Sequence, residues 1–168
     1  MKEISVSELK DNMFDAIGKE WILVTAGNED NFNMMTASWG GTGILWGLPV
    51  AFIFIRPERY TYEFIEAGET VTLSFLGEGN KAVHSVCGSK SGRNTDKVAE
   101  TGLKPFTTPS GNINYQQSRL TIECHKLYAD VIEPEHFIDK SLVNRWYGGT
   151  HGGFHKFYVL QIDHVWVK

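Results

Sequence analysis

Six stretches of this chain have the composition of β-strands, and only short segments separate them. They are Trp21–Thr25, Asn33–Trp39, Val50–Ile55, Thr70–Phe75, Arg119–Glu133 and Phe157–Val167. Strands joined by short turns or short helices pair with their neighbours, whereas parallel strands need long crossover connections. The pattern therefore predicts a mainly β fold built on an antiparallel sheet. Closure of that sheet into a small barrel would remove its exposed edges.

The strand-like stretches differ in how their apolar residues are arranged. Val50–Ile55 is apolar without alternation, which is typical of a strand buried on both faces. Thr70–Phe75 alternates apolar and polar residues, which predicts a strand with one apolar face. In Arg119–Glu133 the apolar residues change parity, and this change indicates a β-bulge near Cys124–Lys126.

Short helices and loops are expected between the strands. A capping-box pattern at Ser5 predicts an N-terminal helix that ends near Gly18. Gly40–Leu48 contains four glycines and is expected to be a loop. Proline is favoured at the first position of a helix, so a helix is expected over Pro57–Ala67. Cys87–Arg93 is expected to be a small, polar, basic loop.

Length and charge limit the functions that this chain can have. Its 168 residues suit one domain, residues 1–168, without repeats or linkers. A net charge of −4 does not indicate broad nucleic-acid binding. No run approaches the ~18 uncharged apolar residues of a membrane helix. The N-terminus has no signal-type apolar core, so a cytoplasmic location without membrane attachment is expected.

Motifs for metal binding or nucleophilic catalysis are missing from the sequence. Cys87 and Cys124 lie 37 positions apart (124 minus 87), form no CxxC, and are expected to stay reduced. His151 and His155 have a spacing that metal ligands can have, but no third ligand accompanies them, so no metal site is predicted. The sequence also lacks GxSxG, Walker and dinucleotide-binding glycine motifs.

Asn33–Gly41 combines features that are rarely found together in a core strand. Thr36 and Ser38 are two residues apart and point to the same face of an extended chain. Ala37 and a glycine pair leave the backbone open to close approach, and Trp39 adds a flat apolar surface. This combination would suit a planar, polar-edged ligand with an acidic tail. A half-buried strand that ends in a glycine turn is the alternative.

Two further stretches have the residue types of an anion site. Arg56–Thr61 places two arginines and a threonine at a helix start, where free N–H groups and the helix dipole favour a phosphate. Alternatively, these arginines pair with Glu58, Glu63 or Glu66. Cys87–Lys97 gathers basic residues around small ones, as in a phosphate nest. The alternative for this stretch is a flexible charged loop.

Three motifs together resemble the flavin reductase-like FMN-binding family, and they are most similar to its flavoredoxin branch. The motifs are Met34–Gly40, Val50–Thr61 and Cys87–Lys97; they occur in the family's order, and the resemblance covers nearly the whole chain. It implies a split β-barrel, usually a homodimer, that holds FMN noncovalently near the subunit interface. The implied FMN contacts are Met35, Thr36, Ala37, Ser38 and Trp39 along the flavin, Arg56, Tyr60 and Thr61 at the phosphate or ribityl side, and Ser89, Lys90 and Ser91 around the anion.

The resemblance also implies a role for His155. The family tends to carry a histidine before its last strand, close to the flavin and the nicotinamide, and His155 matches that position. Leu160 stands where the family often has a glycine.

The activity implied by the resemblance is that of an NAD(P)H:flavin oxidoreductase. The alternative is an electron-transfer flavoprotein that a protein partner reduces, without turnover of NAD(P)H; a flavin-storage or sensing module is a third possibility. In each case the flavin carries the redox chemistry, and the protein binds, orients and tunes it. No amino-acid nucleophile and no obligatory general base are expected.

Overall fold

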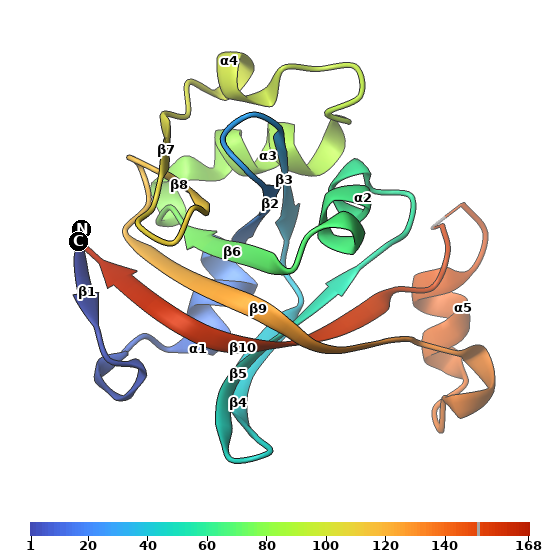
Figure 1. The fold of residues 1–168 in the computed structure, drawn as a ribbon. Helices are drawn as coiled ribbons and strands as arrows, with labels where there is room; N and C mark the ends of the chain where they lie inside the picture. The colour runs from blue at the N-terminus through green and yellow to red at the C-terminus, as the bar shows by residue number, and fades with distance from the viewer. Residues whose placement is uncertain (151) are drawn as a thin grey trace.

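The chain forms an eight-stranded antiparallel sheet with short helices around it (Figure 1). The computed structural model describes residues 1–150 and 152–168. The strands are β1 (Lys2–Ile4), β2 (Ile22–Gly27), β3 (Phe32–Ala37), β4 (Gly40–Leu45), β5 (Leu48–Ile55), β6 (Thr70–Phe75), β7 (Pro105–Thr107), β8 (Ile113–Tyr115), β9 (Leu120–Val131) and β10 (Lys156–Val167). The α-helices are α1 (Met13–Asp15), α2 (Tyr60–Ala67), α3 (Lys81–Ser89), α4 (Lys97–Thr101) and α5 (Ser141–Tyr147). Among the described residues, no helix is long and apolar enough to span a membrane.

The strand order shows where the sheet opens. The order is β3-β2-β6-β9-β10-β5-β4, with β1 added beside β10, and every pairing is antiparallel. β3 and β4 therefore lie at opposite edges of the sheet, yet only Ser38 and Trp39 separate them in the chain. The sheet must curl until its two edges meet at this dipeptide. The mainly β, antiparallel prediction is confirmed, and the split in the curled sheet lies at Ser38–Trp39.

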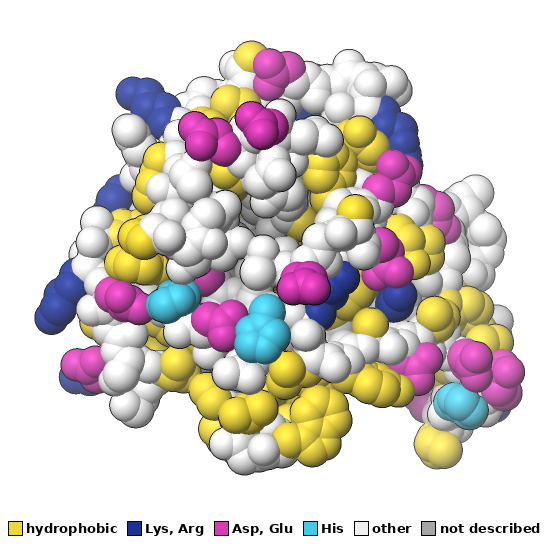
Figure 2. Space-filling model, viewed as in Figure 1, with side chains coloured by type: hydrophobic (Ala, Val, Ile, Leu, Met, Phe, Trp, Pro, Cys, Tyr) yellow, Lys and Arg dark blue, Asp and Glu magenta, His cyan; other side chains and the backbone are white. Residues whose placement is uncertain are grey.

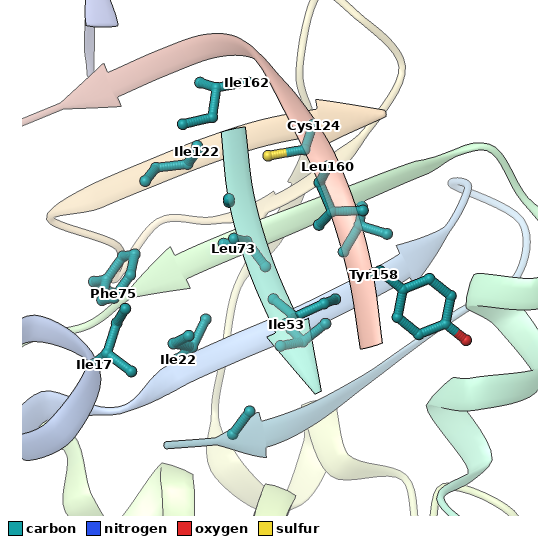
Figure 3. Packing of buried hydrophobic residues seen from close by; sticks show 14 of the residues in the cluster. Ile17, Ile22, Ile53, Leu73, Phe75, Ile122, Cys124, Tyr158, Leu160 and Ile162 are labelled. Carbon is teal, nitrogen blue, oxygen red and sulfur yellow. The ribbon is translucent and has the colours of Figure 1, made fainter. Parts of the chain in front are cut away.

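Two hydrophobic clusters lie on opposite sides of β2 and β3. The larger one is formed by the inner faces of the long strands, where Leu73, Ile122 and Leu160 pack together (Figure 3). The smaller cluster includes Leu23 and Met34. Ile22, Val24 and Met35, by contrast, belong to the larger cluster, because successive residues of a strand point to opposite faces.

A change of register between β9 and β10 confirms the predicted β-bulge, one residue further along the chain than Cys124–Lys126. Val159 pairs with Tyr128 and Leu160 pairs with Lys126, so the intervening residue of β9 is left unpaired. A second register shift follows between Ile162 and His164 on β10. These irregularities accompany the strong bend of both strands in Figure 1.

The N-terminal helix predicted from Ser5 to Gly18 is wrong for its first half. The Glu8 carboxylate accepts a hydrogen bond from the Ser5 N–H at 2.8 Å, but the cap opens only a 3₁₀ turn over Val6–Glu8. Helical structure resumes at α1 and continues as a π-helical turn, Ala16–Glu20. Ahead of the 3₁₀ turn, Lys2–Ile4 form β1, a strand that was not predicted, because the edge of β10 is available to pair with them.

The loop predicted over Gly40–Leu48 is also wrong, because most of it is strand β4. It pairs with β5 throughout, and Trp46 and Gly47 make the turn with φ angles of 54° and 74°. Two positive φ angles in a two-residue turn match the twist of a β-hairpin. The hairpin extends away from the body of the molecule (Figure 1).

Candidate functional site

A cavity of about 250 Å³ opens at the split of the sheet. It is lined by Met35, Thr36, Ala37, Ser38, Trp39, Phe54, Arg56, Arg59, Trp146 and His155. Seven of the twelve site residues predicted from sequence are among them. The structure therefore brings together the predicted Met35–Trp39 segment, the arginine segment after β5, and the histidine before β10.

The connection between β3 and β4 forms the polar wall of the cavity. Ala37 is the last residue of β3 that pairs with β2, and Gly40 is the first of β4 that pairs with β5. Ser38 and Trp39 lie outside both ladders, so their peptide groups are free to meet a ligand. A side chain at Gly40 would collide with the Phe52 carbonyl, which explains the glycine at this close approach.

Thr36 is oriented by His84, a residue that sequence reasoning missed. The Thr36 hydroxyl donates to the His84 carbonyl at 2.8 Å, and its oxygen lies 3.2 Å from His84 Nδ1. Because the hydroxyl proton is used on the carbonyl, Nδ1–H is the donor in the second contact. Burial, with help from Lys81, lowers the pKa of His84 to about 4, so the ring is neutral at pH 7. No motif marks His84, because only the packing of α3 on β3 brings it to Thr36.

Aromatic side chains form another part of the lining, and two of them, Trp146 and His155, come from the connection between β9 and β10. The Trp39 ring lies 5.0 Å from the Trp146 ring and 5.0 Å from the His155 ring. The Tyr147 hydroxyl lies 3.0 Å from His155 Nδ1. Burial, with the charge of Arg56, lowers the pKa of His155 to about 4. His155 thus reaches the cavity as a neutral imidazole.

Arg56 fastens the β9–β10 connection to the cavity. Its guanidinium donates to the Gly153 carbonyl at 2.7 Å and to the Trp146 carbonyl at 2.8 Å, and it lies over the Tyr147 ring at 5.1 Å. Glu58 accepts from the Gly153 N–H, which holds the same loop from the other side. Arg56 lines the cavity as predicted, although two of its donors already serve backbone carbonyls.

Arg59 is a second cation at the cavity, and the resemblance did not assign it. The predicted helix over Pro57–Ala67 begins late, at Tyr60, so Arg59 is the residue before it rather than part of its first turn. Its guanidinium donates to the Cys87 carbonyl at 3.0 Å, in the last turn of α3. The sequence did hold a signal, because Arg59 belongs to the predicted anion segment.

The end of α3 lies directly against β3. A side chain at Gly88 would meet Thr36, and one at Gly92 would collide with Asn33 and press on Tyr60. The three stretches that predicted the site therefore converge in space. Their convergence depends on small residues, because α3 and the loop after it could not approach β3 so closely with larger ones.

The predicted anion residues of the third stretch lie outside the 250 Å³ cavity. Cys87–Ser89 is the last turn of α3 and not part of a loop. The Ser89 hydroxyl donates to Ser85, the Lys90 ammonium pairs with Glu100, and the Ser91 hydroxyl accepts from the backbone of the same loop. Their role toward a phosphate stays a prediction.

Tyr60 and Thr61 also lie outside the cavity. Thr61 is buried and accepts a hydrogen bond from Asn33 Nδ2 at 2.8 Å. Tyr60 lines a separate hollow of about 430 Å³, together with the buried Lys97. Burial lowers the pKa of Lys97 to about 8, and its ammonium donates to the Met34 carbonyl at 2.8 Å.

The described residues contain no evident nucleophile or metal centre at the cavity. Burial raises the pKa of the Cys87 thiol to about 11, so Cys87 is a packing residue of the smaller cluster. Among residues 1–150 and 152–168, no three His, Cys, Asp or Glu side chains are placed to hold a metal ion. His151, noted for its spacing from His155, lies outside the described residues.

Known proteins of similar fold include flavoproteins. An FMN-binding protein from Thermus thermophilus, with bound p-hydroxybenzaldehyde, aligns with a TM-score of 0.67 and 20% identity over 100% of this chain and 82% of that one. Flavoredoxin of Desulfovibrio vulgaris (Miyazaki F) aligns with a TM-score of 0.68 and 22% identity over 100% and 77%. An NADH:FAD oxidoreductase of Streptomyces globisporus C-1027 aligns with a TM-score of 0.63 and 14% identity over 89% and 75%.

Sequence comparison assigns the family. No curated protein sequence matches this chain. Residues 14–168, however, match the family described as flavin reductase like domain. That match covers all of the cavity's lining and confirms the resemblance of the three motifs. The chain therefore belongs to the flavin reductase-like domain family.

Proposed function

We propose that this protein binds FMN at the split of the sheet and acts as an NAD(P)H:flavin oxidoreductase. The observation that supports this proposal is the cavity itself, where open peptide groups, flat apolar side chains and two cations converge. Such a site suits a ligand with a flat ring, polar ring edges and a phosphate. Membership of the family makes a flavin the first choice for that ligand.

The residue types that line the cavity match the chemical groups of an FMN molecule. Trp39 and Phe54 offer apolar faces to the ring system, and the Ser38–Trp39 peptide groups offer hydrogen bonds to its polar edge. Arg59 and Arg56 provide positive charge for the phosphate. Tyr60, Thr61, Ser89, Lys90 and Ser91 remain proposed phosphate-side contacts that this cavity does not include.

The protein's part in the reaction is to bind, orient and exclude water. When bound, FMN supplies the hydride chemistry. Thr36, fixed by His84, presents its hydroxyl at one wall in a single orientation. His155, also on the lining, is neutral, and because its Nδ1 is paired with the Tyr147 hydroxyl, Nε2 is the ring nitrogen left for a ligand. Trp39 and Trp146 shield the space between them.

Rapid mixing with nicotinamide distinguishes the proposed reductase from an electron-transfer flavoprotein. The FMN-loaded protein should lose its yellow absorbance in a stopped-flow experiment with NADH or with NADPH. The measurement is the rate of bleaching near the flavin absorption maximum under anaerobic conditions. An absence of bleaching with both reductants, while dithionite still reduces the flavin, would exclude the reductase. The likeness of the fold to flavoredoxin favours the electron-transfer role as the second candidate.

We also propose that the protein is a homodimer, in which the β4–β5 hairpin meets the second copy. Ile44 and Trp46 at the hairpin end are 74% and 62% exposed, and Tyr128 beside Trp46 is also exposed. Figure 2 shows hydrophobic side chains gathered at this end of the molecule. Burying such a patch between two copies is favourable.

Replacing Trp46 with glutamate should separate the dimer. In the dimer, the introduced carboxylate would be buried in an apolar interface without a charged or hydrogen-bonding partner, and this burial costs free energy of association. Light scattering should give about twice 18.9 kDa for the natural chain and about 18.9 kDa for Trp46→Glu. The control is Phe106→Glu, which changes another exposed aromatic, on β7, a strand that pairs with β8 and not with the hairpin. A monomeric natural chain, or equal masses for both variants, would contradict the assignment.

A further inference from the structure

A second and larger cavity lies beside the candidate flavin site. Its volume is about 830 Å³, within the ~300–1,000 Å³ range of small-molecule sites. Large apolar side chains dominate its lining, among them Trp39, Phe137, Leu142, Trp146, Tyr147 and Phe157. We call this cavity the aromatic chamber. Trp39 and Trp146 line both cavities, so the chamber adjoins the flavin site.

Contacts among its aromatic side chains hold the chamber's wall in place. Tyr147 stacks on Phe154 at 4.4 Å and meets Phe137 edge-on at 5.9 Å. The Trp39–Trp146 edge contact forms the boundary with the flavin site. Arg56 lies behind the Tyr147 ring and fastens the same segment. The chamber is thus an open groove, partly exposed at Leu142 and Trp146, whose lining comes from Trp39, β9, β10 and the connection between them.

The charge at the chamber's rim restricts the ligand. Asp130, Glu133 and Asp139 line it together with His136, whereas no lysine or arginine among the described residues does. The Tyr128 hydroxyl donates to Asp130 at 2.8 Å and lowers the pKa of that carboxyl. The Ser141 hydroxyl likewise lowers the pKa of Asp139. Both carboxylates are therefore charged at neutral pH, and they repel phosphates and carboxylates.

We propose that the aromatic chamber binds a flat aromatic small molecule that is neutral or positively charged. Apolar and aromatic walls favour ring stacking, and the carboxylate rim selects against anions. A nicotinamide dinucleotide, which carries two or more phosphate charges, is excluded by the same rim. Trp39 places the chamber's ligand beside the flavin site, so its assignment as the organic substrate of this protein rests on the function proposed above.

Three naphthalene probes of equal shape test the charge preference. They are 2-naphthamidine, which is cationic, 2-naphthamide, which is neutral, and 2-naphthoate, which is anionic. Calorimetric titration into the full chain should show binding of the first two and at least ~10-fold weaker binding of naphthoate. Equal or tighter binding of naphthoate would overturn the proposal.

Matched variants locate the binding. Leu142 lines the chamber and Asn144 lies on the same helix outside its lining. Leu142→Trp places a larger side chain on the lining of the chamber and should weaken naphthamide binding, whereas Asn144→Trp should leave it within about twofold, as expected for a surface site. Glu133→Gln should reduce the ratio of amidine affinity to naphthoate affinity by ~2–5-fold, as expected for one exposed charge. Glu135→Gln changes a residue two positions away and outside the lining, and it should leave this ratio unchanged.

Saturation with FMN separates this proposal from the one on flavin binding. Naphthamide binding should persist at saturating FMN, because the chamber is distinct from the flavin site. Three results would each overturn the chamber as a ligand site. They are competition between FMN and naphthamide, an equal change of naphthamide affinity in Leu142→Trp and Asn144→Trp, and a change of oligomeric mass in Leu142→Trp. A protein that binds naphthamide as described but ignores FMN would refute the proposed function and the substrate assignment, while the chamber's charge preference would stand.

Discussion

Lowering the pH from about 6.5 to about 4 should destabilise the fold by roughly 3 kcal/mol for each of His84 and His155. Both histidines have a folded-state pKa of about 4, below the ordinary 6.5. Between these values the unfolded chain binds protons that the folded chain excludes, so stability falls as the pH falls. Above 6.5 both states are neutral at these rings, and the effect disappears.

The charged groups around each ring explain why the folded protein excludes the protons. Lys81 opposes protonation of His84, and Glu20 favours it, but burial dominates. For His155, burial again dominates, with Arg56 opposing and Glu58 favouring protonation. A buried imidazolium would have to give up hydration that these neighbours do not replace.

Urea unfolding at pH 7 and pH 4.5 checks this prediction. The loss of unfolding free energy between the two pH values should shrink in His84→Asn and in His155→Asn. His136→Asn is the matched control, because the His136 side chain is 75% exposed and lies on the surface. If the loss of unfolding free energy between pH 7 and pH 4.5 were equal in all three variants, the pH dependence could not be assigned to the buried His84 and His155 rings.

Replacing Arg56 with alanine should weaken FMN binding by about 1.5–3 kcal/mol, or roughly 10- to 150-fold, as expected for the loss of charged hydrogen bonds. The substitution removes positive charge from the cavity. It also releases the Gly153 and Trp146 carbonyls, and with them the segment that carries Trp146 and Tyr147. Flavin fluorescence titration measures the affinity, and limited proteolysis measures the release of the segment. Unchanged affinity would refute the assignment of Arg56 to the flavin site.

Two companion variants separate the charge of Arg56 from its anchoring role. Arg56→Lys keeps the charge but cannot reproduce the two-pronged contact with both carbonyls. Recovery of FMN affinity in this variant would indicate that charge dominates. Arg59→Ala removes the other cavity cation without touching the β9–β10 connection, because Arg59 contacts the Cys87 carbonyl. It should weaken FMN binding while leaving the segment resistant to proteolysis.

Sequence patterns predicted the parts of this protein that depend on local residue order. The composition and apolar patterns of short stretches indicated the strands, and the parity change in Arg119–Glu133 indicated the bulge. Where the prediction failed, as for β1 and β4, a strand formed because another strand's edge was present to pair with it. Edge pairing is a long-range event, and glycine-rich β4 has no β-strand signal of its own.

The sequence by itself determined the antiparallel sheet, the family, and the Met35–Trp39 and His155 walls of the candidate site. Only the tertiary structure decided that Arg56 anchors a loop, that Arg59 joins it at the cavity, and that His84 orients Thr36. The physical reason is the range of the interactions. Strand periodicity arises between residues two apart, whereas a guanidinium or an imidazole finds its hydrogen-bond partner across the folded chain.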